Sequence, residues 1–172
     1  KELRIRNWDE FPVDQSSIDA VFLTHSHIDH TGYIPLLVKN GFKGKIYCSY
    51  ATFTLCSLLL VDSGMLQEED AKHANKHGYS NHNPALPLYT KIDAVKSLKF
   101  FKVIDYNKVL DIGKYLKITF TRSGHILGSS SVTISDGKKT ITFSGDLGRY
   151  NHPIIKPPTQ IKKTDYLVME ST

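Results

Sequence analysis

Four side chains that can bind a metal ion occur within six residues, in His25-Ser26-His27-Ile28-Asp29-His30. The apolar run at residues 20–24 predicts a strand that ends at His25. In extended backbone, side chains at positions i and i+2 point to the same side, so His25 and His27 can present their imidazoles to one cation. Asp29 and His30 follow where the chain begins to turn and could serve a second cation nearby. The spacing predicts a double metal site. The alternative, a solvated polar loop, would leave three imidazoles clustered without a partner.

The donor atoms of this cluster decide which metals it suits. They are imidazole nitrogens and a carboxylate, with no thiolate among them. Such a set suits Zn²⁺ first and then Mn²⁺ or Fe²⁺, and the donors alone do not choose between these ions.

Two residues far along the chain could complete the site. His125 follows a predicted strand at residues 115–122, and Asp146 follows another at residues 140–144. Both stand near glycines, which let the backbone turn sharply, and loops at one edge of a sheet can meet in space. Either residue alone could merely belong to a turn. Together with the first cluster, they predict a site assembled from three strand ends.

Other histidines are assigned no role. His73 and His77 stand four positions apart on a predicted helix, a spacing that can bind zinc. Neighbouring lysines and the lack of a third ligand favour a solvated helix face. His82 and His152 are left out as well.

Alternating and β-branched residues predict the strands that must position the site. Seven are expected, near residues 20–24, 45–48, 100–104, 115–122, 131–135, 140–144 and 165–169. Asp136-Gly137 predicts a hairpin, because this pair tolerates positive φ angles. Helices are predicted at residues 33–39, 52–61, 68–76 and 91–98; Gly41 closes the first, and Thr90 caps the last with Asp93 at its third position. The order favours a sheet-rich α/β sandwich with helices outside.

The composition is that of one globular domain. Of 172 residues, 40% are hydrophobic and 23% are charged, which excludes a disordered chain. The longest apolar run, residues 58–61, is far shorter than the roughly 20 residues that cross a bilayer, which excludes a membrane span. Cys48 and Cys56 lack the spacing of a disulfide framework and predict buried free thiols in a reducing, cytoplasmic compartment. The net charge of +5 suits an anionic partner.

The pattern His25-x-His27-x-Asp29-His30, followed by His125 and Asp146, resembles that of the metallo-β-lactamase superfamily. Two shorter segments are similar to motifs of its β-CASP nucleases, the branch that contains the cleavage-and-polyadenylation endonuclease and its prokaryotic relatives. These segments are Gly124-His125-Ile126-Leu127-Gly128-Ser129 and Met169-Glu170-Ser171-Thr172. The resemblance covers nearly the whole chain and implies that residues 1–172 are a partial metallo-β-lactamase domain. An αββα sandwich is expected, without the opening strands before Lys1 and without the β-CASP part after Thr172.

The resemblance also implies a role for each site residue. The six metal ligands would be divided between two zinc ions, with Asp146 bridging both: His25, His27 and His125 on one side, Asp29 and His30 on the other. Asp146 would also orient the nucleophile. Glu170 would support catalysis beside the metals by partnering a histidine of a later segment; the alternative is a surface carboxylate at a strand end.

The function implied by the resemblance is hydrolysis of RNA phosphodiester bonds, in endonuclease or exonuclease mode, by hydroxide activated between two zinc ions. RNA is favoured over DNA by the resemblance alone, and single-stranded DNA stays an alternative partner. Two other functions stay open: hydrolysis of a thioester or lactam by the same metal pair, and a noncatalytic nucleic-acid-binding subunit. Without the expected flanking segments, the chain by itself could be inactive. The oligomeric state is not predicted.

Overall fold

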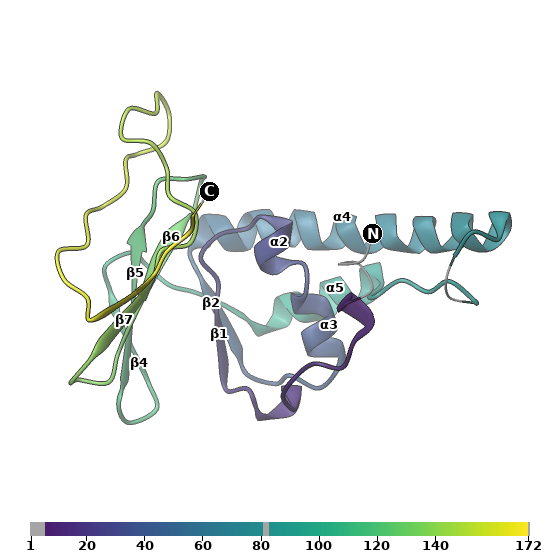
Figure 1. Cartoon of the computed structure of the whole chain (residues 1–172), viewed down its shortest axis with the longest axis horizontal. Helices are drawn as coiled ribbons and strands as arrows, with labels where there is room; N and C mark the ends of the chain where they lie inside the picture. The colour runs from purple at the N-terminus through teal and green to yellow at the C-terminus, as the bar shows by residue number, and fades with distance from the viewer. Residues whose placement is uncertain (1–5, 81–82, 172) are drawn as a thin grey trace.

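The structure is a computed structural model that describes residues 6–80 and 83–171. These residues form two sheets packed face to face, with helices on the outer side of one of them (Figure 1). The first sheet has three parallel strands in the order β1-β2-β3. Their bounds are β1 (Ala20–Phe22), β2 (Lys45–Cys48) and β3 (Phe101–Val103).

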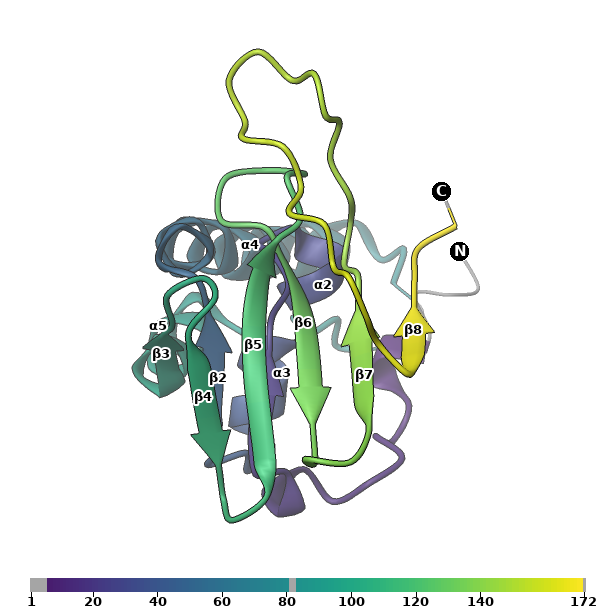
Figure 2. The same cartoon turned by 90° about the vertical axis from the view of Figure 1, so that its left-hand side faces the viewer.

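The second sheet has five strands in sequence order, from β4 to β8. They are β4 (Val109–Ile112), β5 (Leu116–Arg122), β6 (Ser130–Ser135), β7 (Thr140–Phe143) and β8 (Tyr166–Val168). Neighbours are antiparallel except β7 and β8, which pair in parallel. The chain between these two strands rises above the ends of β5 and β6 and returns across the sheet to β8 (Figure 2). Within residues 6–80 and 83–171, no helix covers this outer face, so the described layers are α, β and β.

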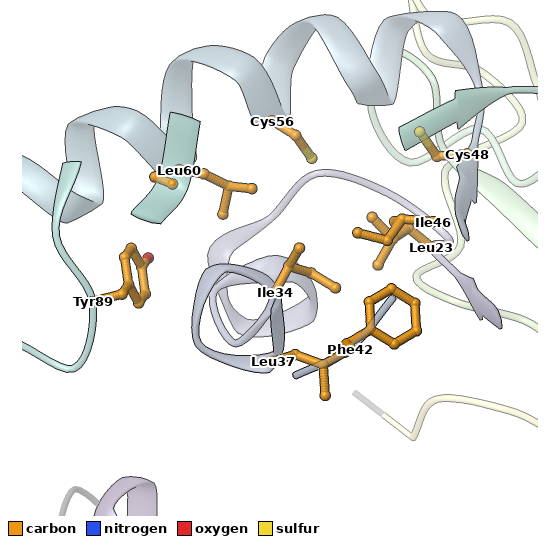
Figure 3. Close-up of a cluster of buried hydrophobic side chains, with 10 residues drawn as sticks. Leu23, Ile34, Leu37, Phe42, Ile46, Cys48, Cys56, Leu60 and Tyr89 are labelled. Carbon is orange, nitrogen blue, oxygen red and sulfur yellow. The ribbon is translucent and has the colours of Figure 1, made fainter. Parts of the chain in front are cut away.

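The helices cover the first sheet and enclose the larger core. They are α2 (Ile28–Thr31), α3 (Ile34–Lys39), α4 (Tyr50–His77) and α5 (Lys91–Ser97), with short 3-10 turns η1 (Arg6–Trp8), η2 (Gln15–Ser17) and η3 (Leu98–Phe100). Side chains from α3, α4, β2 and the segments just after β1 and α3 meet in this core (Figure 3), among them Leu23, Ile34, Leu37, Phe42, Ile46, Cys56 and Leu60. Burial of this apolar surface holds the helices against the sheet.

A second, smaller core lies between the two sheets. Tyr47 of β2 packs against Ile118, Phe120 and Val132 of the second sheet. Phe22 of β1 also joins it, with its ring 5.5 Å from that of Tyr47 between centroids. This core sets the two sheets against each other and thereby brings the ends of β1, β5 and β7 to one edge.

All seven predicted strands are confirmed, and β4 is an additional strand that the periodicity did not predict. The hairpin at Asp136-Gly137 is confirmed, since Gly137 has a φ of 85° and the Asp136 carboxylate accepts from two backbone N–H groups. The helices at residues 33–39 and 91–98 are confirmed too, the latter with a capping box between Thr90 and Asp93.

The prediction of two separate helices at residues 52–61 and 68–76 was wrong, because α4 runs unbroken from Tyr50 to His77. Gly64, at its middle, is buried against the start of α5. A Cβ there would lie 2.8 Å from the Lys91 nitrogen, so the glycine permits close contact between the helices. Tertiary packing therefore carries α4 through a residue of low helix propensity.

Cys48 and Cys56 are buried free thiols, as the sequence predicted. Burial raises the pKa of each thiol to about 12, so both are protonated at neutral pH. In the part of the chain that the structure describes, no helix combines the length and the apolar character of a membrane span.

Candidate metal centre

His25 lies just beyond β1 and is fully buried. The backbone before it is tied to both sheets: Leu23 N–H donates to Tyr47 O, and Ser130 N–H donates to Thr24 O. The Thr24 hydroxyl lies 3.1 Å from His25 Nδ1. This contact leaves Nε2 of His25 as the ring atom that faces the centre.

Helix α2 begins directly after His27, which is its N-cap residue. The Thr31 hydroxyl donates to the carbonyl oxygens of Ser26 and His27, at 3.2 and 2.9 Å, and so braces the turn between strand and helix. His27 Nδ1 lies 3.0 Å from His25 Nε2. The two imidazoles therefore converge as the spacing predicted.

His125 reaches the centre from the loop after β5. Ser129 shapes this loop, because its hydroxyl accepts from the N–H groups of His125 and Ile126 at 2.9 and 3.2 Å. The carbonyl of Gly128 accepts from Ser49 and Thr52 at the start of α4. These contacts anchor the loop, and His125 Nε2 lies 3.3 Å from His27 Nδ1.

Asp146 lies in the loop after β7, and Gly145 lets this loop pack close to Thr24. Gly145 has a φ of 56°, and a Cβ on it would lie 2.7 Å from the Cβ of Thr24. Only glycine allows this approach, which brings the Asp146 loop against the His25 loop. Gly148 N–H also donates to Ser123 O, at 2.9 Å, and so ties the loop to the one that carries His125.

The Asp146 carboxylate lies between the histidines. Its Oδ2 is 3.5 Å from His25 Nε2 and 3.3 Å from His125 Nε2. Its other oxygen, Oδ1, is 3.3 Å from His30 Nε2. The ligand atoms of Asp146, His25, His27 and His125 all lie within 4.8 Å of one another.

Asp29 and His30 lie in α2, and His30 contacts the carboxylate oxygen of Asp146 that His125 does not contact. Asp29 Oδ2 is 3.5 Å from His30 Nε2, and the Asp29 side chain is 75% exposed. The six predicted ligands therefore lie close together. Among the described interactions, Asp29 contacts His30 but not Asp146.

The surroundings of His25 favour its metal-binding form. Burial, followed by electrostatic interaction with the neighbouring histidines, first of all His30, lowers the pKa of His25 to about 4, although Asp146 opposes the shift. The imidazole is therefore neutral at physiological pH, with a lone pair available to a cation. Neutral imidazoles and carboxylates are donors that Zn²⁺ accepts, so the residues present fit such an ion.

Glu170 lies next to the Asp146 loop. Its Oε1 accepts from Leu147 N–H at 2.6 Å, and its own N–H donates to the Ser144 hydroxyl at 3.2 Å. The carboxylate therefore contacts the residue that follows Asp146. Sequence spacing carried no signal for this contact, nor for the part that Ser129 and Thr24 play in holding two of the histidines.

The other histidines that the structure describes lie outside this group. His73 and His77 are exposed on α4, with ring centroids 4.3 Å apart, and His73 Nδ1 is 3.0 Å from the Tyr79 hydroxyl. His152 Nδ1 accepts from two backbone N–H groups. His82 lies outside the described residues.

The sequence profile of the Metallo-beta-lactamase superfamily matches residues 9–167, which include every predicted ligand. The chain belongs to this superfamily. Its two face-to-face sheets and outer helices are the corresponding α/β fold, and the assignment made from the His25 to His30 motif is confirmed.

Relatives of this chain are named as a ribonuclease and as transcription termination factors. Ribonuclease TTHA0252 of Thermus thermophilus is 29% identical over 167 residues, which are 97% of this chain and 35% of the relative. Transcription termination factor FttA of Methanosarcina mazei is 40% identical over 138 residues, 79% of this chain and 19% of the relative. FttA of Methanothermobacter thermautotrophicus is 33% identical over 169 residues, 96% of this chain and 24% of the relative. The chain thus spans about a third or less of the length of these relatives.

Proposed function

We propose that this superfamily member is a metal-dependent nuclease of the β-CASP branch that hydrolyses phosphodiester bonds of RNA with two zinc ions. The observation that carries the proposal is the position of the Asp146 carboxylate. One of its oxygens faces His25 and His125, and the other faces His30. A carboxylate whose two oxygens face different nitrogen donors is suited to bridge two cations.

The contacts support a division of the ligands. His25, His27 and His125 would hold one zinc ion, because their ring nitrogens converge on the same side of Asp146. The second ion would be held by His30 and Asp29, which lie beyond the other carboxylate oxygen. Zinc in such a pair supplies Lewis-acid chemistry, namely a more acidic water and neutralisation of charge on the phosphate.

The protein's own contribution is the fixed geometry of these groups. Asp146 would orient the attacking oxygen, since one oxygen of its carboxylate faces His25 and His125 and the other faces His30. Glu170 would support this step by holding the backbone of Leu147, next to Asp146, through its 2.6 Å contact. The contact with the Thr24 hydroxyl keeps His25 in one ring orientation, so little reorganisation is needed when the substrate arrives.

RNA is the substrate that the relatives support best. One is called a ribonuclease and others transcription termination factors. The net charge of +5 suits a polyanion, although it does not separate RNA from single-stranded DNA. The proposed metal site therefore rests on the residues of this chain, and the proposed class of substrate rests on the names of the relatives.

Metal content tests the centre directly. We expect the purified chain to hold two zinc ions per molecule by inductively coupled plasma mass spectrometry. Asp146→Ala should lower this to one or fewer while the circular dichroism spectrum is unchanged. Asp62→Ala is the matched control, because Asp62 is an exposed acidic residue on α4. Equal zinc content in both variants would contradict the bridging role of Asp146.

Substrate assays test the reaction. Labelled RNA should be cleaved by the zinc-loaded wild-type protein and not by Asp146→Ala or after treatment with EDTA. Hydrolysis of a thioester or lactam with RNA left intact would replace the nuclease with another hydrolase. Salt-sensitive RNA binding that EDTA does not alter, without turnover, would replace it with a binding subunit.

A further inference from the structure

A hollow of about 440 Å³ lies beside the metal centre, outside the ligand set. Its walls come from the start of α4, the segment after β3 at residues 104–106, the end of β5, the loop after His125 and the chain at residues 154–156. Pockets for small organic groups in proteins have volumes of about 300–1,000 Å³. The hollow is therefore large enough for one planar ring system.

The hollow and the metal centre share one loop. The Tyr106 hydroxyl, on the wall of the hollow, donates to Ser129 O at 3.0 Å. The Ser129 hydroxyl accepts from His125 N–H at 2.9 Å. Ile126, which follows His125, also lines the hollow. A ligand bound in the hollow would thus lie next to the loop that carries His125.

The walls combine aromatic rings with positive charge. The Arg122 guanidinium lies over the Tyr106 ring, 5.1 Å from its centroid. Tyr50 contributes a second ring and is 71% exposed, a large fraction for so large an aromatic side chain. Lys156 adds a cation at the rim, and the one carboxylate of the lining, Asp105, is paired with Lys108. Aromatic side chains beside Arg and Lys are the groups on which bases of single-stranded nucleic acids stack.

We propose that this hollow is a nucleobase subsite, which stacks a base of the RNA strand next to the scissile phosphate on Tyr50. The inference rests on the proposed nuclease function and adds the place where the strand is held. Recognition is by stacking, so the subsite accepts any of the bases, and Arg122 and Lys156 favour the adjoining phosphates.

Tyr50 can be changed without disturbing the fold. It is the first residue of α4, and the helix cap is made by the preceding Ser49, whose hydroxyl accepts from Thr52 N–H. The hydrogen bond between Tyr50 and the Thr54 hydroxyl uses the backbone carbonyl of Tyr50 and not its side chain. Tyr50→Ala should therefore keep the circular dichroism spectrum and the zinc content of the wild type.

The test is the affinity for RNA in EDTA, where cleavage does not interfere. Fluorescence anisotropy with a fluorescein-labelled oligouridylate should show about tenfold weaker binding for Tyr50→Ala, as expected for loss of one base stack. Tyr50→Phe, which keeps the ring, should bind within twofold of the wild type. The matched control is Tyr115→Ala, since Tyr115 is 68% exposed but lies in the turn between β4 and β5. Binding of inorganic polyphosphate, which has charge but no bases, should be the same in all four proteins.

Several results would overturn the subsite. The first is that Tyr50→Ala binds RNA as tightly as the wild type. The second is that Tyr50→Ala loses as much affinity for polyphosphate as for RNA. The third is that the wild type does not bind RNA. Failure of the subsite is distinct from failure of the nuclease. Zinc-dependent cleavage with no effect of Tyr50→Ala on affinity would refute only the subsite, whereas Tyr50-dependent binding without zinc-dependent cleavage would refute the proposed reaction.

Discussion

Replacing Gly145 by alanine tests whether close packing of the Asp146 loop against Thr24 builds the metal centre. Gly145 has a φ of 56°, and an added Cβ would lie 2.7 Å from Thr24 Cβ and 3.0 Å from Ser130 O. Gly113, in the turn between β4 and β5, has nearly the same φ, 58°, but a Cβ there would meet nothing within 4 Å. The two glycines therefore differ in packing and hardly at all in backbone conformation.

The expected loss in free energy of unfolding follows from this difference in packing. Alanine in the left-handed region destabilises the folded state by roughly 1–2 kcal/mol. It also lowers the conformational entropy of the unfolded chain, which offsets about 0.4–1 kcal/mol of this loss. Both terms apply equally to the two positions, so Gly113→Ala should lose about 1 kcal/mol. Gly145→Ala also forces neighbouring atoms apart, which typically costs about 1–3 kcal/mol more. We expect its total loss to be about 2–4 kcal/mol.

Urea unfolding followed by circular dichroism measures both free energies of unfolding. Zinc titration of the same proteins should show about tenfold weaker binding in Gly145→Ala, because the displaced loop carries Asp146, and no change in Gly113→Ala. The reasoning would be refuted if the two variants lost the same stability and bound zinc equally. In that case Thr24 and the Asp146 loop would not be in close contact.

Three further outcomes are expected. Thr90→Ala removes the cap of α5 and should lower the free energy of unfolding by about 1 kcal/mol in urea; an unchanged midpoint would contradict this. Cys48 and Cys56, whose pKa burial raises to about 12, should react with a disulfide reagent at pH 8 only after denaturation. Hydrogen bonds from Thr140 lower the pKa of the Asp165 carboxyl in the folded protein below its unfolded value of 3.8. The ionised carboxylate therefore stabilises the fold fully above pH 3.8, and this stabilisation is lost as the pH falls through the pKa of the folded state. Asp165→Asn should therefore lose less Tm between pH 7 and pH 3 than the wild type does, and equal losses would contradict the shift.

The features that the sequence predicted correctly depend on neighbours in the chain. The His25 to His30 cluster, the Asp136-Gly137 turn and the cap at Thr90 each lie within six residues, so spacing and local propensity determine them. The positions of His125 and Asp146, each just after a predicted strand and near glycines, predicted that they join the cluster, and the family motif agreed with this prediction.

Only the tertiary structure decided how distant residues meet. The two carboxylate oxygens of Asp146 face different histidines because the core between the sheets aligns the ends of β1, β5 and β7. Packing against the start of α5 keeps α4 continuous at Gly64, and the fold brings Tyr50 and Tyr106 to the walls of one hollow. Periodicity reports which side of an element is apolar, but the partner of that side, and the distance between two loops far apart in the chain, are determined by how the sheets and helices pack.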